Sequence, residues 1–151
     1  MADMTALVRS VLIEELEKLC QEVRTLAEPL NEQQFWTKPL DPGNSVGHLV
    51  LHLTGNLNHF VGAQLGGTGY MREREREFTE TNVPSKSEAL QRLEEAVALF
   101  RKVVSGLRAD QLASPHPETR FGVVLKALVH LVSHFALHRG QMSYIIRLLN
   151  K

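Results

Sequence analysis

The chain has 151 residues, 43% of them hydrophobic and 23% charged, a composition typical of a globular protein with one domain spanning residues 1–151. Basic and acidic residues number 17 each, so there is no basic field to favour nucleic acid or an anionic membrane as a partner. The single cysteine, Cys20, excludes an internal disulfide. Because residues 1–10 also lack the pattern of a secretory signal, we expect a cytoplasmic protein.

The first predicted element is a helix over residues 4–28. Its apolar residues recur at steps of three and four, the period of an amphipathic helix, and Pro29 ends it. Cys20 lies on or near the apolar face, so we interpret it as a core thiol. Residues 30–44 form a loop with a short turn at 31–36, where we expect Trp36 to cover one end of the core.

A second helix is predicted over residues 45–65, with Asn44 or Ser45 as N-cap and Gly66-Gly67 as its end. It is apolar nearly all round but carries several polar side chains, which would be costly in lipid, so we predict a buried helix and no membrane span. One face holds Leu49, His52, Asn56, Phe60 and Ala63, and the opposite face holds Val46, Val50, Leu57 and Val61.

Residues 66–84 are a long connection that contains the run RERERE from Arg72 to Glu77. We interpret this run as a solvated segment; the alternative is a rim for a charged ligand at the mouth of a site. A third helix follows at 86–105, where Ser85 and Glu88 have the spacing of a capping box. A proline-containing loop at 109–119 then leads to the fourth helix, at 120–149.

The fourth helix carries the most informative spacing, because His130, His134 and His138 recur every four residues on the face expected to be buried. Buried polar groups must be paired, and stacked imidazoles with no carboxylate nearby cannot easily pair with each other. A divalent metal ion would satisfy them. Histidines one helical turn apart can ligate a single ion, and His52 is our choice for the third ligand.

Three imidazoles plus water are the ligand set of an open catalytic site, whereas a closed structural site would need a fourth ligand, for which Cys20 is the only candidate. Three imidazoles suit zinc, nickel, copper and iron alike. We expect His48, His59 and His130 to be core residues and His116 to be a loop residue without a role. Candidates to orient a ligand or a bound water are Asn56, Gln141 and His130, although plain packing polarity explains them equally well.

Other metal and nucleophile motifs are missing from the sequence. There is no Glu-x-x-His pair of the kind found in diiron bundles, and no HExxH, phosphate loop or GxSxG motif.

The segments NSVGHLVLHLTGNL (residues 44–57) and HFALHRGQ (residues 134–141) resemble the two signature helices of the DinB-like superfamily of metalloenzymes, and the RERERE stretch is similar too. The resemblance implies a four-helix bundle, often dimeric, in which His52, His134 and His138 bind a divalent metal. It also implies thiol S-transfer as an activity, since some members use bacillithiol, mycothiol or glutathione.

Two functions follow as hypotheses. The first is a metal-dependent enzyme of the thiol S-transferase type, with a small-molecule thiol as cosubstrate. The second is a non-catalytic metal-binding bundle, such as a stress-related or interaction protein.

The predicted fold is all-α, a four-helix bundle with connections of about a dozen residues or more, for which a simple up-down-up-down order is not forced. We also predict a homodimer. The stripe Val46, Val50, Leu57 and Val61, and a second stripe formed by Leu125, Leu128, Val132 and Phe135, would otherwise be left in water.

Overall fold

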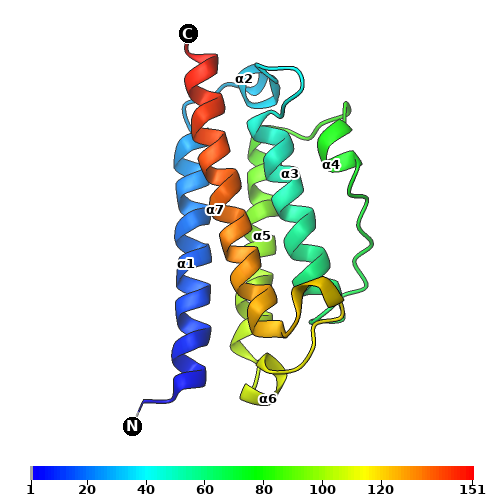
Figure 1. Cartoon of the computed structure of the whole chain (residues 1–151). Coiled ribbons are helices and arrows are strands. Elements are labelled where there is room, and N and C mark those ends of the chain that lie inside the picture. The colour runs from blue at the N-terminus through cyan, green and yellow to red at the C-terminus, as the bar shows by residue number, and fades with distance from the viewer. Residues whose placement is uncertain (1) are drawn as a thin grey trace.

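The computed structural model describes residues 2–151, which fold into helices joined by loops (Figure 1). In chain order the elements are α1 (Met4–Ala27), α2 (Glu32–Trp36), α3 (Val46–Leu57), the π-helical η1 (Asn58–Ala63), α4 (Arg76–Thr79), α5 (Lys86–Ser105), α6 (Ala109–Leu112), the 3-10 turn η2 (Thr119–Phe121) and α7 (Val124–Leu149). Over the described residues, β pairing is limited to one isolated bridge between Pro115 and Val123. The all-α prediction is therefore confirmed.

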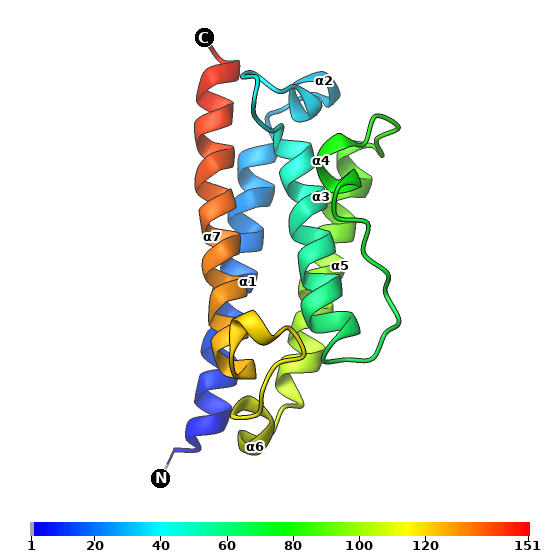
Figure 2. The ribbon, with the colours of Figure 1, turned by 45° about the vertical axis from the view of Figure 1, so that its right-hand side comes forward.

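Four long helices, α1, α3, α5 and α7, form the bundle. Helices α1 and α7 run in one direction and α3 and α5 run in the other (Figures 1 and 2). Each helix packs on its parallel partner and on one helix of the other pair, α1 on α5 and α3 on α7, so that α1 lies diagonally across from α3. Because α3 and α5 are parallel, the chain between them must return along the bundle. About twenty extended residues can span far more than the roughly 30 Å length of α3 and η1 together. The order is therefore up-down-down-up.

The helix starts follow the local sequence. The Ser45 hydroxyl accepts a hydrogen bond from the His48 N–H at 2.9 Å, and the Ser85 hydroxyl accepts one from the Glu88 N–H at 3.1 Å, so both predicted N-caps are present. The helix predicted over 45–65 changes character after Leu57, where η1 widens to a π-helix and the Gln64 N–H donates to the carbonyl of His59. The end of this helix is thus wider than an α-helix.

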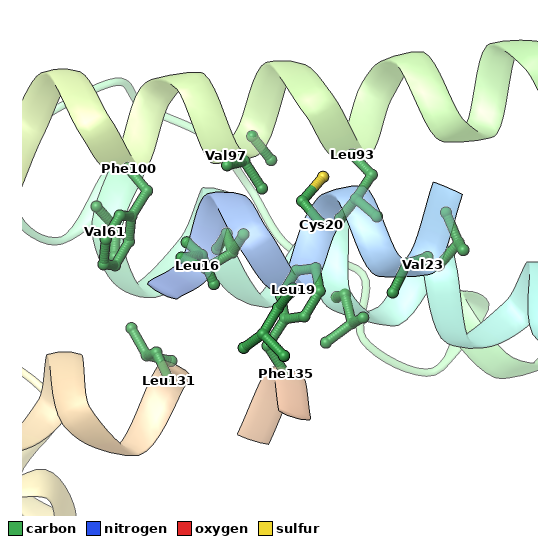
Figure 3. Close-up of a cluster of buried hydrophobic side chains, with 14 of the residues drawn as sticks. Leu16, Leu19, Cys20, Val23, Val61, Leu93, Val97, Phe100, Leu131 and Phe135 are labelled. Carbon is green, nitrogen blue, oxygen red and sulfur yellow. The ribbon is translucent and has the colours of Figure 1, made fainter. Parts of the chain in front are cut away.

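The core receives side chains from all four long helices (Figure 3). Leu16 of α1, Phe100 of α5 and Phe135 of α7 are among its fully buried members. Cys20 lies in the same cluster beside Leu93, and burial, aided by the nearby Glu94 carboxylate, raises the pKa of its thiol to about 11. Cys20 is therefore an unreactive core thiol, as predicted.

Trp36 packs at the end of the bundle where α3 begins. Its indole lies so close to Gly47 that a Cβ there would sit 2.4 Å from a ring carbon, and it meets the His48 ring edge-on at 5.3 Å. The predicted cover for one end of the core is present.

Among the described residues, no helix is long and apolar enough to cross a membrane.

The apolar stripes predicted to be exposed are mostly buried inside the single chain. On α3 and η1, Val46, Val50, Leu57 and Val61 are at most 1% exposed, because α5 packs on them. On α7, Leu128 and Phe135 are fully buried and Leu125 and Val132 are half-buried. Each helix of a bundle contacts two neighbours, so a helix that is apolar on two faces can bury both of them within one chain. The homodimer stays a prediction, but the fully buried residues of these stripes cannot form its surface.

Candidate metal centre

Three histidines from two helices converge at the middle of the bundle. His52 projects from α3, and His134 and His138 project from successive turns of the antiparallel α7. The His134 Nε2 lies 3.1 Å from the His52 Nε2 and 3.0 Å from the His138 Nε2, and the three ligand atoms all lie within 4.8 Å of one another. Nitrogens bound tetrahedrally to one zinc ion at about 2.0–2.1 Å are roughly 3.4 Å apart. The geometry therefore fits a shared ion.

Hydrogen bonds on the far side of two rings set which nitrogen faces the centre. The His52 Nδ1 lies 3.0 Å from a carboxylate oxygen of Glu77, and the His138 Nδ1 lies 2.7 Å from the amide oxygen of Gln141. An oxygen acceptor requires Nδ1 to carry the proton, which leaves the Nε2 lone pair directed at the centre. The Nδ1 of His134 is buried and has no hydrogen-bond partner in the described chain.

The Glu77 carboxylate is the part of the site that the sequence did not predict. It is buried, and Arg72 donates to it through both Nε and an η nitrogen, each at 2.9 Å. Burial by itself raises the pKa of this carboxyl, but the hydrogen bonds from His52 and Arg72 outweigh it and hold the pKa below its usual value. The interpretation of RERERE as a solvated segment is therefore wrong at its two ends, although the residues between them are exposed.

Gly55 makes room for this carboxylate. A Cβ at position 55 would lie 1.9 Å from the Glu77 Oε2 and 2.7 Å from its Cδ. Glycine in a helix interior costs stability, so its presence on a buried face of α3, three residues after His52, was a signal that something approaches the backbone there. The sequence could not show what approached.

Two of the three imidazoles, those of His134 and His138, are held neutral. Burial, together with the nearby His138, His52 and His130 rings, lowers the pKa of His134 to about 3. Burial likewise lowers the pKa of His138, against the opposing effect of the hydrogen bond that its ring donates to Gln141. Neutral imidazole is the form that ligates a metal ion, so the site is ready to bind without first losing a proton from either ring.

The other histidines do not join the centre. His48 is buried, with Nδ1 2.6 Å from the Ser45 hydroxyl and Nε2 2.9 Å from the Glu80 carbonyl, as expected for a core residue. His59 is half-buried. His116, predicted to have no role, is 2% exposed and fastens its loop, because Nε2 donates to the Phe60 carbonyl at 3.0 Å.

His130 is exposed, so the prediction that it is a core residue is wrong. Each step of four residues turns by about 40° relative to the helix face, and two steps carry His130 about 80° away from His138. Its ring stacks on that of His134 at 6.1 Å. Asn56 is buried, but no hydrogen bond joins its side chain to the three histidines in the described part of the chain.

Cys20 is not a member of the cluster. The group of three in the described chain consists of His52, His134 and His138, and Cys20 lies in the core between α1 and α5 (Figure 3). The fourth ligand that a closed structural site would need is thus not supplied by this thiol.

Two grooves are lined by residues that neighbour the centre, although not by the three histidines themselves. One, of about 610 Å³, is mainly apolar and runs between the 39–44 loop and α7, with Leu49, Gln141 and Tyr144 in its walls. The other, of about 630 Å³, is lined by charged residues of α4 and α5 and includes Gly55 and Glu77. Gln141 therefore both lines the apolar groove and accepts the hydrogen bond from the His138 ring.

Comparison with known proteins bears on the fold and the family. A family model described as Mycothiol-S-transferase matches residues 11–149, which agrees with the resemblance to the DinB-like superfamily. The bundle superposes on a conserved protein from Enterococcus faecalis with a TM-score of 0.79 and 18% identity over 100% of both chains. It also superposes on YfiT from Bacillus subtilis, described as a probable metal-dependent hydrolase with an unusual four-helix bundle topology, with a TM-score of 0.74 and 21% identity over 94% of this chain and 87% of YfiT. No curated protein matches the sequence significantly.

Proposed function

We propose that this chain, which belongs to the mycothiol-S-transferase family, is a metal-dependent enzyme that joins a low-molecular-weight thiol of the mycothiol class to an electrophilic acceptor. The observation that carries the proposal is the convergence of the Nε2 atoms of His52, His134 and His138. These three residues would hold a divalent ion. A bound divalent ion lowers the pKa of a thiol, so that the sulfur can react as a thiolate at neutral pH.

The protein's own residues prepare this chemistry. Glu77 and Gln141 hold the His52 and His138 rings with Nε2 directed inward, so little reorganisation is needed on binding. The Phe78 ring lies 4.6 Å from the His52 ring and covers it on the side of the connection. In the reaction, a bond forms between the thiol sulfur and the acceptor carbon, the bond from that carbon to the leaving group breaks, and the thiol proton is released.

The apolar groove is our proposed site for the acceptor. Its volume of about 610 Å³ is in the range of small-molecule sites, and it reaches Gln141, the residue hydrogen-bonded to His138. A groove of this composition favours an acceptor with an apolar body. Free thiols of this class are kept reduced in the cytoplasm, where we place the protein.

The experiment begins with elemental analysis of untagged protein and of the alanine variants of His52, His134 and His138. We expect the wild type to carry zinc, nickel, copper or iron in about equimolar amount, and each variant to lose it. His130→Ala is the matched control on α7, because this exposed ring offers no nitrogen to the cluster, and it should keep its metal.

Activity is then measured with mycothiol, bacillithiol or glutathione and an aryl halide whose substitution changes its absorbance. Metal-dependent conjugation with mycothiol supports the proposal. Hydrolysis of ester or amide substrates without thiol transfer would refute it in favour of the hydrolase chemistry described for YfiT. Metal binding with neither activity would favour the non-catalytic alternative.

A further inference from the structure

We propose that the connection between α3 and α5 is part of the metal centre, with Glu77 as a positioning residue that orients His52, Arg72 holding Glu77 in place and Gly55 leaving room for its carboxylate. The inference rests on the proposed metal site. It assigns a role to a segment that has no metal-ligand motif and whose alternating charges resemble a solvated loop.

The Glu77 carboxylate is held at both oxygens. Oε1 accepts from the His52 Nδ1 at 3.0 Å and from an η nitrogen of Arg72 at 2.9 Å, while Oε2 accepts from the Arg72 Nε at 2.9 Å. The side chains of His52, Arg72 and Glu77 are 5%, 8% and 8% exposed. A two-pronged arginine contact fixes the plane of a carboxylate, and this carboxylate in turn fixes the plane and tautomer of His52.

Contacts on both sides of Glu77 hold the connection against the rest of the bundle. Lys38 Nζ donates to the Phe78 carbonyl at 3.0 Å, and the His48 Nε2 lies 2.9 Å from the Glu80 carbonyl. The Arg72 guanidinium also lies over the Phe60 ring, 5.5 Å from its centroid. These contacts tie the two ends of the segment 72–80 to the first residues of α3, to η1 and to the loop before α3.

The position of Glu77 separates two of the charges in the segment from the other four. In RERERE, the first arginine and the last glutamate turn inward as a pair, whereas Glu73 and Arg76 pair with each other on the surface. A structural ion pair alone would need only Arg72 and Glu77. The additional hydrogen bond to a ring nitrogen of His52 is what gives the pair an effect on the metal site.

Docking of the connection and metal binding are then coupled. An ion bound by the His52 Nε2 favours the state in which Nδ1–H is bonded to Glu77, and that state is the docked connection. By thermodynamic linkage, ion binding stabilises the docked connection by the same free energy by which docking strengthens ion binding.

The test compares Glu77→Gln and Glu77→Ala with Glu73→Gln, a matched control because Glu73 belongs to the same run but is exposed and paired only with Arg76. Zinc affinity is measured against a chelator of known affinity. We expect a loss of roughly 10–100-fold for Glu77→Ala, a smaller loss for Glu77→Gln, and a change under twofold for Glu73→Gln. Wild-type affinity in both Glu77 variants would overturn the inference.

Two further measurements separate positioning from simple structural support. Histidine ¹⁵N NMR of the metal-free wild type should show His52 protonated on Nδ1, and this preference should be lost in Glu77→Ala. Amide hydrogen exchange in residues 70–82 should slow on adding zinc to the wild type and not on adding it to Glu77→Ala. A wild-type His52 protonated on Nε2 would overturn the inference even if the variants failed to fold. Failure of the wild type to bind zinc or any other divalent ion would instead refute the proposed function.

Discussion

Gly55→Ala tests the close approach of the connection to α3 without reference to metal. On helix propensity alone, alanine should stabilise the interior of α3 by about 1 kcal/mol. Its methyl group, however, would lie 1.9 Å from the Glu77 Oε2 and 2.7 Å from Cδ, so the carboxylate must leave. Separating a buried ion pair costs about 3–5 kcal/mol because Arg72 is left without its partner. We therefore expect a net loss of about 2–4 kcal/mol.

The assay is urea unfolding of the metal-free protein followed by circular dichroism. Gly140→Ala is the matched control, since it is also a glycine inside a long helix but has nothing within 4 Å of the added Cβ. We expect this control to be as stable as the wild type or up to about 1 kcal/mol more stable. If Gly55→Ala unfolds at the same urea concentration as Gly140→Ala, then Glu77 does not occupy the place described above.

Three further predictions follow from burial. The metal-free protein should lose stability as the pH falls below about 6.5, because the pKa of His134 is lowered to about 3 in the folded state while the unfolded chain takes up the proton. Denaturant unfolding at pH 7.5 and at pH 5.5 should give free energies of unfolding that differ by up to about 1.4 kcal/mol for this group, less what solvent screening removes. A midpoint that rises on acidification would contradict this. His116→Ala should lower the melting temperature, at a cost of about 1–3 kcal/mol for the unpaired Phe60 carbonyl, yet leave metal content unchanged. For the homodimer, Val50→Asp should unfold the chain because Val50 is 0% exposed, and sedimentation should show the wild type as a dimer; a monomeric wild type would refute the homodimer.

The sequence alone was sufficient for the four long helices, although not for every limit, and for the identity of the three clustered histidines. Apolar residues at steps of three and four predict helices whose limits agree with α1 and α5 to within a residue. Local hydrogen bonds set the starts of α3 and α5 through Ser45 and Ser85, and these depend only on neighbours in the chain. The four-residue step from His134 to His138 likewise fixes their relative position, because an α-helix has one geometry.

Contacts between distant segments decided the rest. The Glu77 carboxylate meets His52 only because α3 and α5 are parallel and the chain must return along α3, and no local pattern in RERERE indicates which of its charges turns inward. Exposure was also decided by the neighbours of each helix: α5 covers Val50, while His130 lies beyond the turn of α7 that faces α3. Periodicity places a residue on a face of its helix, but the tertiary arrangement determines what that face contacts.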